Sequence, residues 1–235
     1  MTRATPVSSA GRPKDAEKHA AILAAARRLF FERGPTAVTI DAVAAAAAVS
    51  RMTVYGHFGD KDALFAAVIA QQARTVGQAL AKISQRATAA SAGSASMLRS
   101  DLIAFGIDLT TFLLQPDLRA FNRLMEGSAA SYPKLAKIWA DNGPRAVVGV
   151  LADQLSRASA AGLIAAPEPA MAARHLTGLF KSIETSGTAS GLSPLPTAPE
   201  IERHVTECVA IFLRGYAPPS FIWPAVGERN DRNSE

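Results

Sequence analysis

The 235-residue chain has one cysteine, few aromatic residues and no hydrophobic run long enough to cross a membrane. The lone Cys208 excludes an intrachain disulfide framework and a cysteine-based zinc site, and no other residue spacing argues for a metal or cofactor. The most apolar stretch, residues 102–114, is too short to span a bilayer and contains Asp108. Because residues 1–13 also lack the apolar core of a secretory signal, we expect a cytoplasmic protein with no membrane partner.

Motifs for phosphate binding and hydrolytic catalysis are also lacking. The sequence has no Gly-rich phosphate loop, no H-E-x-x-H, no G-x-S-x-G and no convincing pair of nucleophile and base. These absences favour a binding protein over an enzyme. A helical enzyme acting on an apolar substrate stays open as an alternative, because apolar cavities carry no motif.

Helix-forming residues dominate what is present. Hydrophobic residues make up 49% of the chain, charged residues 19% and aromatic residues 6%. Long stretches are rich in Ala, Leu, Arg and Gln, which have high helix propensity, whereas sheets favour aromatic residues. We therefore predict an all-α fold with a substantial core.

The net charge of +5 is unevenly distributed. Residues 1–62 hold nine Lys and Arg against six Asp and Glu, so most of the excess lies in about a quarter of the chain. Residues 1–14, with Arg3, Arg12 and Lys14 and no acid, predict a flexible basic arm. Such an arm can reach the minor groove of DNA beside a bound domain.

Short helices are predicted after the arm. From Asp15 the apolar residues recur at helical spacing, and Gly34-Pro35 predicts the end of this first helix. Thr39 and Ser50 are suitable N-caps for a second and a third short helix.

The rest of the chain predicts a larger helical domain at residues 63–217, followed by a tail at 218–235. A longer fourth helix, with Asp60 as its cap, leads into it. Further helices are predicted at 96–115, 117–130, 133–161 with an interruption near Gly143-Pro144, 168–186 and 198–215.

The second and third helices, joined by a tight turn, predict a helix-turn-helix within a domain at residues 15–62. Its inward positions are apolar: Val43, Val49, Val54 and Phe58. The opposite face of the third helix is mixed and has little reason to be buried: Arg51, Met52, Thr53, Tyr55 and His57. The start of that helix presents free backbone N–H groups and the positive end of the helix dipole, which suit DNA phosphates.

A string of residues at 12–70 is specific enough to suggest a family. It contains Arg12-Pro13, Ile22-Leu23-x-Ala-Ala-x-x-Leu-Phe, Gly34, Thr39-Ile40-x-x-Val43-Ala44 and Val49-Ser50-Arg51-Met52-Thr53-Val54-Tyr55-x-His57-Phe58-x-Asp60-Lys61-x-x-Leu64. This string resembles the TetR/AcrR family of one-component regulators. The stretch Phe121-Asn122-Arg123-Leu124-Met125-Glu126 and Tyr132-Pro133-x-Leu135, followed by Gly143-Pro144, is similar to the AefR-like group of C-terminal regulatory domains.

The resemblance implies that the start of the third helix enters the major groove of an operator. Arg51 would then contact a guanine edge or a phosphate, and Met52 would contact a thymine methyl or act as a spacer. Gly56 departs from the bulky residue usual there and weakens the helix by about 1 kcal/mol relative to Ala. The implied DNA-binding set is Arg12, Thr39, Ser50, Arg51, Met52, Thr53, Tyr55, His57 and Lys61.

Three members of this set, Tyr55, His57 and Lys61, correspond to the family's phosphate contacts. Taken alone, Tyr55 can be a core aromatic, while His57 and Lys61 can be ordinary surface residues. Only their joint spacing favours DNA binding.

The resemblance also implies a cavity for a small hydrophobic effector in the helical domain. Large apolar residues at helical spacing are more often plain core, so the pocket is a weaker prediction than the helix-turn-helix. Asp108, Asn122, Arg123 and Glu126 are the polar residues expected to orient an effector. The predicted pocket is Phe105, Asp108, Leu109, Phe112, Phe121, Asn122, Met125 and Trp139.

The last two helices carry apolar faces similar to those through which relatives form homodimers. Reading an operator with two half-sites also requires two recognition helices. His175 and His204 are interpreted as interface or surface residues. The predicted dimer interface is Leu176, Leu179, Phe180, Ile183, Val205, Val209, Phe212 and Leu213.

These predictions describe a ligand-responsive transcriptional regulator, a repressor that binds a palindromic double-stranded DNA operator as a homodimer. A small hydrophobic effector would release it by tilting the fourth helix, which changes the distance between the recognition helices. The alternatives are a helical protein-interaction module whose helix-turn-helix no longer binds DNA, and the helical enzyme already mentioned.

Overall fold

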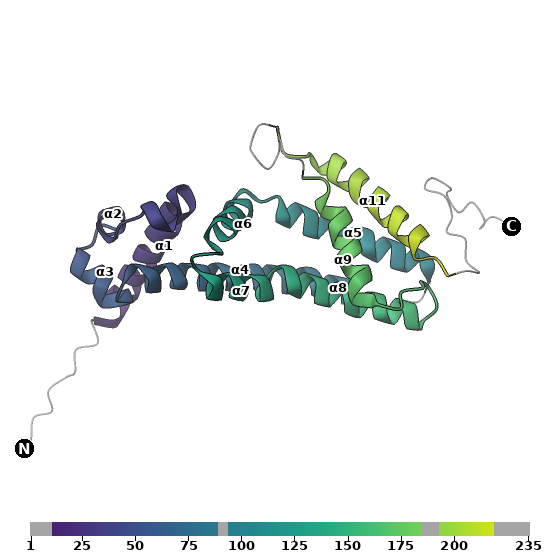
Figure 1. Ribbon diagram of the computed structural model, residues 1–235, viewed down its shortest axis with the longest axis horizontal. Helices are drawn as coiled ribbons and strands as arrows, with labels where there is room; N and C mark the ends of the chain where they lie inside the picture. Colours follow the sequence, from purple (N-terminus) through teal and green to yellow (C-terminus); the bar gives the residue numbers. More distant parts are fainter. Residues whose placement is uncertain (1–10, 89–93, 185–192, 219–235) are drawn as a thin grey trace, which may run out of the picture. The chain divides into compact units, whose positions relative to one another are not determined.

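The computed structural model describes residues 11–88, 94–184 and 193–218, and all regular structure in these ranges is helical (Figure 1). This confirms the all-α prediction. The helices are α1 (Gly11–Ala37), α2 (Ile40–Ala46), α3 (Arg51–Phe58), α4 (Lys61–Thr88), α5 (Ala95–Leu113), α6 (Pro116–Ser128), α7 (Pro133–Asn142), α8 (Pro144–Ala160), α9 (Pro169–Lys181) and α11 (Ala198–Gly215). None of the helices in the described ranges is both long and apolar enough to cross a membrane.

The chain divides into two compact units. Unit 1 comprises residues 1–75 and 120–140, and unit 2 comprises residues 76–119 and 141–235. The expected boundary at residue 62 differs from this division, because the first half of α4 and most of α6 and α7 pack with the helix-turn-helix. Within unit 1, the Phe65 ring lies 4.9 Å from Tyr132 and the Phe31 ring 5.6 Å from Phe121.

Side-chain caps determine where the helices of unit 1 begin. The Oγ atoms of Thr39 and Ser50 accept hydrogen bonds from the backbone N–H groups of Ala42 and Thr53, at 3.2 and 3.1 Å. Asp60 Oδ1 accepts one from Ala63 N–H at 2.7 Å, at the start of α4. All three caps are as the sequence predicts.

The first helix differs from its prediction at both ends. It begins at Gly11, so residues 11–14 are helical and the expected arm shortens to residues 1–10, which lie outside the described residues. Pro13 is tolerated because the first-turn amides of a helix need no partner. Gly34 does interrupt the helix, with φ 74° and ψ 161°, and residues 35–37 form one more turn.

Unit 1 has its own apolar core. Ile22, Ala26, Leu29 and Phe30 of α1 are at most 5% exposed, and the Phe30 ring meets the Phe65 ring edge-on at 5.0 Å. The inward residues Val43 and Val54 of the predicted helix-turn-helix are fully buried. Val49 and Phe58 are only partly buried, and Phe58 stacks on His19 at 4.6 Å.

In unit 2, α9 and α11 pack together and against α5 and α8 (Figure 1). The pair α9 and α11 is antiparallel: His175 Nδ1 of α9 lies 2.7 Å from the hydroxyl of Tyr216, which follows α11. At the other end, Cys208 Sγ of α11 donates to the carbonyl oxygen of Leu179 at 3.3 Å. The start of one helix therefore lies at the end of the other.

Candidate nucleic-acid interface

The turn between α2 and α3 closes without glycine. Ala48 adopts φ 53°, a left-handed conformation that is uncommon for a residue with a side chain. Its position is held by backbone hydrogen bonds from Ala47 N–H to Val43 O (2.9 Å) and from Val49 N–H to Ala44 O (3.0 Å). The turn of the helix-turn-helix therefore forms with an alanine in the left-handed conformation.

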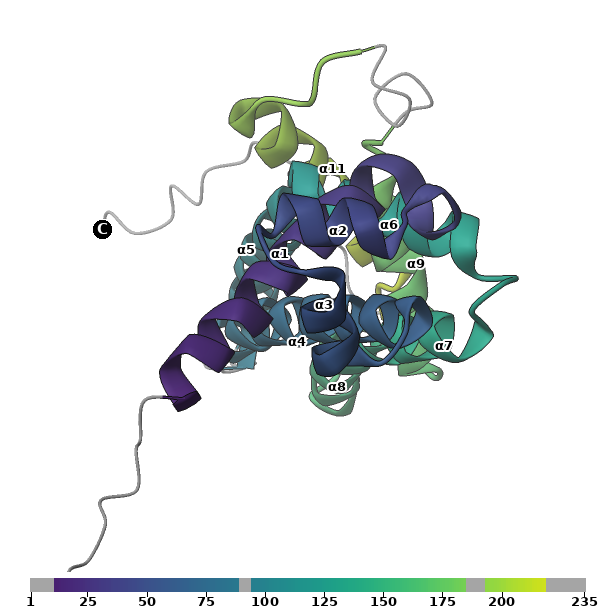
Figure 2. The same cartoon turned by 90° about the vertical axis from the view of Figure 1, so that its left-hand side faces the viewer.

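The outward face of α3 is open to solvent (Figure 2). Met52 is 77% exposed, the most exposed large apolar side chain of the described residues, and Gly56 is exposed with open space around it. Thr53 is partly buried, and its hydroxyl lies 2.8 Å from that of Ser50. The side chain of Met52 is therefore accessible to a partner, and its contact with DNA stays a prediction.

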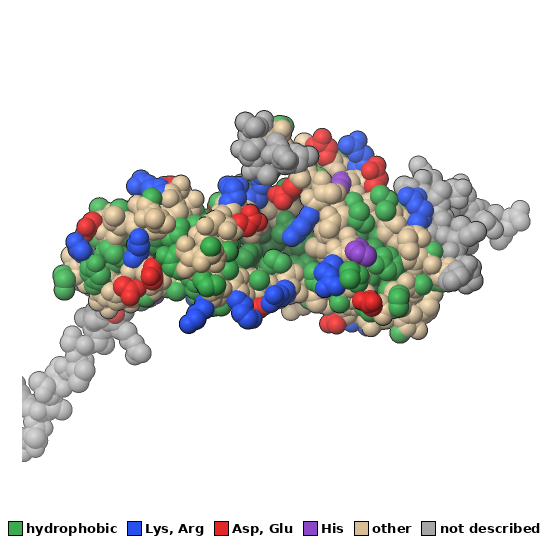
Figure 3. Space-filling view, in the orientation of Figure 1, with side chains coloured by type: hydrophobic (Ala, Val, Ile, Leu, Met, Phe, Trp, Pro, Cys, Tyr) green, Lys and Arg blue, Asp and Glu red, His purple; other side chains and the backbone are tan. Residues whose placement is uncertain are grey.

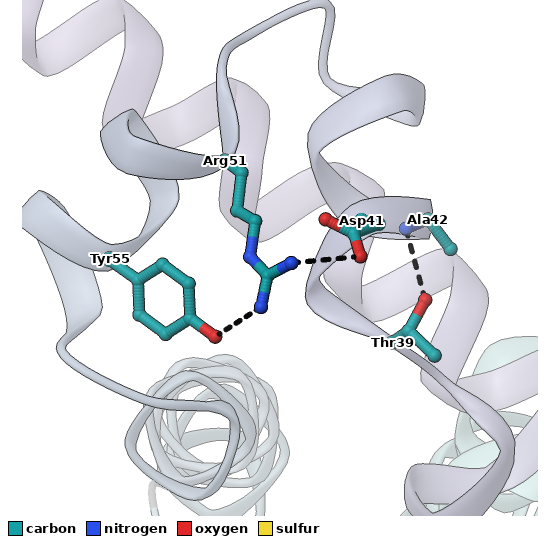
Figure 4. A network of polar contacts seen from close by, with 5 residues as sticks. All are labelled: Thr39, Asp41, Ala42, Arg51 and Tyr55. Carbon is teal, nitrogen blue, oxygen red and sulfur yellow. Dashed lines mark hydrogen bonds and ion pairs between the residues drawn. The ribbon is translucent and has the colours of Figure 1, made fainter.

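Arg51 is held between α2 and its own helix (Figure 4). Its guanidinium donates to Asp41 Oδ2 and to the Tyr55 hydroxyl, both at 3.3 Å, and lies 5.5 Å from the Tyr55 ring centre. The hydrogen bond to Tyr55 and then the charge of Asp41 raise the pKa of Arg51. Its side chain is 59% exposed, so the guanidinium can leave Asp41 for another anion.

The other predicted phosphate contacts, His57 and Lys61, differ in their surroundings. His57 Nε2 lies 3.3 Å from Asp15 Oδ1 of α1, and the His57 side chain is only 14% exposed. A phosphate would therefore have to compete with a carboxylate for this ring. Lys61, at the start of α4, is partly exposed, and the side chain of Arg12 lies outside the described residues.

Charged side chains around this region are mixed in sign. On the face drawn in Figure 3, basic, acidic and apolar side chains alternate. One of the six acids counted in residues 1–62, Asp41, lies 3.3 Å from the Arg51 guanidinium, so positive and negative groups lie side by side here. Among the described residues, no group of three or more His, Cys, Asp or Glu is arranged to hold a metal ion.

The predicted effector pocket is divided between the units. Phe105, Asp108, Leu109 and Phe112 are in unit 2, and Phe121, Asn122, Met125 and Trp139 are in unit 1. In unit 1 the Phe121 and Trp139 rings meet edge-on at 4.7 Å, and Phe121 and Met125 are at most 2% exposed. These residues pack as core, and their role in effector binding stays a prediction.

Among the described residues of unit 2, two buried side-chain oxygens have no hydrogen-bond partner: Thr110 Oγ1 of α5 and Gln154 Oε1 of α8. Their side chains are 2% and 6% exposed. A buried polar atom without a partner is unfavourable by about 1–3 kcal/mol, so each is a place where a ligand can supply the missing bond. Neither residue could be predicted as a ligand contact from the sequence, because the sequence does not show which polar atoms are buried without a partner.

The residues of the predicted dimer interface differ in their exposure within the single chain. Six of its eight residues are at most 2% exposed within the single chain, so they have no surface to offer a partner: Leu176, Phe180, Val205, Val209, Phe212 and Leu213. Their apolar faces are covered by other helices of unit 2. Leu179 and Ile183 are partly exposed and stay predicted contacts. Ile211 of α11, which lies outside the main apolar stripe and was not among the predicted contacts, is 51% exposed.

The two histidines of this region have internal partners. His204 Nε2 lies 3.1 and 3.2 Å from the carbonyl oxygens of Leu179 and Phe180, at the end of α9. His175 bonds to Tyr216, as described above. Both therefore join α9 to the chain near α11, which the sequence interpretation did not anticipate.

Asp41 and Asp15 were also missed as residues of the candidate interface. The only signal for Asp41 in the sequence is its place in the first turn of α2, where a carboxylate favours the helix dipole. Its ion pair with Arg51, ten residues away, depends on the turn geometry.

Two known families match the chain. Residues 22–68 match the family described as bacterial regulatory proteins, tetR family, and residues 100–218 match the AefR-like transcriptional repressor, C-terminal domain.

Curated relatives match over about a quarter of the chain. The HTH-type transcriptional regulator YdeS of Bacillus subtilis is 46% identical over 57 residues, which is 24% of this chain and 29% of YdeS. An HTH-type transcriptional repressor of Mycobacterium tuberculosis is 51% identical over 53 residues, 23% of this chain and 28% of that protein. The chain thus spans less than a third of the length of these relatives.

Solved structures match over nearly the whole fold. A TetR-family regulator from Mesorhizobium loti has a TM-score of 0.73 and 26% identity, covering 87% of this chain and 99% of that chain. The flavonoid-responsive regulator FrrA has a TM-score of 0.65 and 27% identity, covering 87% of this chain and 100% of that chain. A TetR regulator from Agrobacterium tumefaciens has a TM-score of 0.67 and 26% identity, covering 86% and 95%.

Proposed function

The chain belongs to the TetR family of transcriptional regulators, and from this premise we propose that it is a repressor that binds a palindromic operator as a homodimer and leaves it when a small hydrophobic effector binds. Under this proposal it acts on the chromosome, in the cytoplasm. The single observation that carries the proposal is the solvent-exposed start of α3. There Met52 projects into solvent, and Arg51 is held only by partners that DNA can replace.

The geometry of α3 supports groove binding. Ser50 caps the helix, so its first turn is fixed and its dipole points outward at the end that meets DNA. Arg51 and Met52 follow directly, at the positions from which helix-turn-helix proteins contact base edges. Arg51 would bind a guanine edge or phosphate, and Met52 a thymine methyl.

Repression rather than activation is supported by two names. The matched C-terminal family is described as a repressor domain, and one curated relative is named a repressor. Repression also needs no surface for contacting RNA polymerase, only occupancy of the operator.

An apolar effector with one or two polar groups fits unit 2. Its interior is rich in Leu and Phe. Among the described residues, Thr110 and Gln154 contribute the only buried side-chain nitrogen or oxygen atoms that lack a hydrogen-bond partner. A ligand hydroxyl can donate to Gln154 Oε1 and so remove an unfavourable buried group. FrrA is named as responsive to flavonoids, which are largely apolar and carry hydroxyls. A molecule of that chemical character is the effector class proposed for this chain.

Helix α4 is the element proposed to transmit the effector's presence. It runs without interruption from Lys61 to Thr88, and its residues belong to unit 1 up to Thr75 and to unit 2 from Val76. A change of α4 direction would alter the separation of the two recognition helices in the dimer. Binding to adjacent major grooves requires a separation of about 34–36 Å, so a shift of a few ångströms releases DNA.

Gel shift with the DNA upstream of the chain's own gene, at two salt concentrations, tests the proposal. A regulator shows sequence preference and a steep salt dependence, whereas an interaction module or an enzyme shows neither. Tyr55→Ala should weaken binding to all sequences alike, and Arg51→Ala should flatten the preference at one position of each half-site. If both variants bind as the wild type does, α3 is not the DNA-facing helix.

A further inference from the structure

Unit 1 contains a cavity that the DNA-binding role does not use. It has a volume of about 390 Å³, within the range of small-molecule sites, and lies between the end of α1 and the segment that joins α6 to α7. Residues 33–37 form one wall, and residues 123–132 contribute the other.

The charge of this cavity is one-sided. Arg33 and Arg123 come from opposite walls, and no Asp or Glu is among the described residues that line it. Within the described part of the chain, neither guanidinium forms an ion pair with a carboxylate. Both arginines are exposed, so water screens the repulsion between them, and an anion that enters the cavity would meet two positive side chains. Their planar donors match the oxygens of a carboxylate or phosphate.

The remaining lining suits an organic body attached to that anion. Pro35 and Leu124 are buried and apolar, and Ser128 and Ser131 add hydroxyls at the α6 end. A free inorganic ion would leave the apolar part of the space unfilled. The lining therefore matches a small organic anion, with its charged group between the arginines and its apolar part against Pro35 and Leu124.

The position of the cavity connects it to the helix-turn-helix. The wall at residues 34–37 is followed directly by Val38 and then by Thr39, the N-cap of α2. On the other side, the hydroxyl of Tyr132 donates to Asp62 Oδ1 of α4 at 3.0 Å. A ligand that draws the two walls together would thus act on the segments that enter α2 and α4.

We propose that this cavity binds a small organic anion, a carboxylate or phosphate on an apolar body, and that the anion modulates operator binding from within unit 1. The site is distinct from the apolar effector site proposed for unit 2, and only its regulatory effect rests on the proposed function. Binding of the anion itself needs no DNA.

Isothermal titration calorimetry on the full chain, without DNA, tests the site with three probes: benzoate, phenyl phosphate and the uncharged benzamide. We expect benzoate or phenyl phosphate to bind, and benzamide to bind at least about tenfold more weakly. The double variant Arg33→Gln/Arg123→Gln should weaken anion binding by about tenfold or more. The matched control Arg28→Gln/Arg74→Gln removes the same charge from exposed positions of unit 1 outside the cavity and should bind as the wild type does.

A second variant fills the space without changing its charge. Gly127 lines the cavity, and a Cβ atom there meets nothing within 4 Å, so Gly127→Phe should fold and block both anions. The site is overturned if neither anion binds the wild type, if benzamide binds equally well, or if the arginine double variant keeps full affinity.

The regulatory effect is measured separately, as operator affinity with and without benzoate or phenyl phosphate. We expect a change of about fivefold or more that disappears in the arginine double variant. Anion binding with an unchanged operator affinity would overturn the regulatory effect and leave the site. Failure to bind any operator would instead contradict the proposed function, without affecting the calorimetric result.

Discussion

The side chain of Arg51 is in equilibrium between an internal carboxylate and the DNA it is proposed to bind. Its two hydrogen bonds, to Asp41 and Tyr55, are long and exposed, so the internal pairing is weak and screened by water. Such a pairing orders the guanidinium beside the groove-facing surface. It also places a negative charge where phosphates would approach.

Removing that charge should strengthen DNA binding. In Asp41→Asn the guanidinium keeps its bond to Tyr55, and we expect operator affinity to rise by about two- to fivefold at low salt. Glu17→Gln removes an exposed carboxylate from the same unit and serves as the charge-matched control. Fluorescence anisotropy with labelled operator measures both variants. A weaker complex with Asp41→Asn would mean that Asp41 positions Arg51 for DNA rather than competing for it.

Cys208 is expected to be unreactive at neutral pH. Burial, and then the charge of Glu207, raise the pKa of its thiol to about 11, and Cys208 Sγ also donates to the Leu179 carbonyl. Only the thiolate reacts with a disulfide reagent. Labelling of the native chain should therefore be slow at pH 8 and accelerate about tenfold per pH unit up to about pH 11, whereas urea-unfolded chain reacts at once at pH 8.

The same shift predicts how stability changes with pH. The folded thiol holds its proton at pH values where the unfolded thiol has lost it, so the native state binds more protons between the unfolded pKa and about 11. The contribution of this group is fully present below the unfolded pKa and falls as pH rises through this window. Equal labelling rates for native and unfolded chain at pH 8 would contradict both expectations.

Residues whose role depends on near neighbours could be predicted from the sequence, and residues whose role depends on distant ones could not. Thr39 and Ser50 cap helices by bonding to groups three residues ahead, so local sequence suffices. His57 was predicted to face phosphate, but its partner Asp15 lies on another helix. The periodicity of the sequence predicts which side of α3 is polar. Only the fold shows that Asp15 of α1 lies beside His57 of α3.

Three helices of unit 2 approach one another closely at Gly106 of α5. A Cβ atom there would lie 2.6 Å from both Phe180 Cζ of α9 and Val205 Cγ1 of α11. The sequence predicts α5 as a helix but gives no reason for a glycine in its middle, where it weakens the helix by about 1 kcal/mol. The structural reason is the contact of three helices at one point.

Gly106→Ala should destabilise unit 2 by about 1–3 kcal/mol, because two buried side chains must move to make room. Gly149 on α8 is exposed, with open space around its Cβ position. Gly149→Ala is therefore the matched control and should stabilise the helix by about 0.5–1 kcal/mol. Urea unfolding followed by circular dichroism compares the two variants. Equal stability of both would mean that α9 and α11 can shift away from α5 without loss.

The apolar stripes of α9 and α11 face the core of the single chain. The helical pattern of α9 and α11 identifies their apolar stripes correctly, since Leu176, Phe180 and Val209 are buried. A stripe that faces the chain's own core and one that faces a partner have the same pattern in a sequence. The helices of unit 2 cover these stripes, which leaves a smaller surface for association.

For the whole molecule, the proposed function requires two chains to associate so that two α3 helices reach one operator. The exposed apolar side chains on the last two helices are Ile211 of α11 and Met171 of α9, at 51% and 38% exposure. Both lie toward the end of the α9–α11 pair marked by the bond between His175 and Tyr216. They are the first candidate contacts for a partner chain, and the partly exposed Leu179 and Ile183 are further candidates at the other end of α9.

Ile211→Glu should therefore separate the dimer, because a carboxylate in an apolar contact loses its hydration without gaining a partner. Sedimentation velocity should show a monomer, and affinity for the full operator should fall by about tenfold or more, while affinity for a single half-site stays unchanged. Met97→Glu changes an exposed apolar side chain on α5, at 45% exposure, to the same acid and should remain dimeric. If Ile211→Glu stays a dimer with full operator affinity, the chains associate through a surface other than this end of α9 and α11.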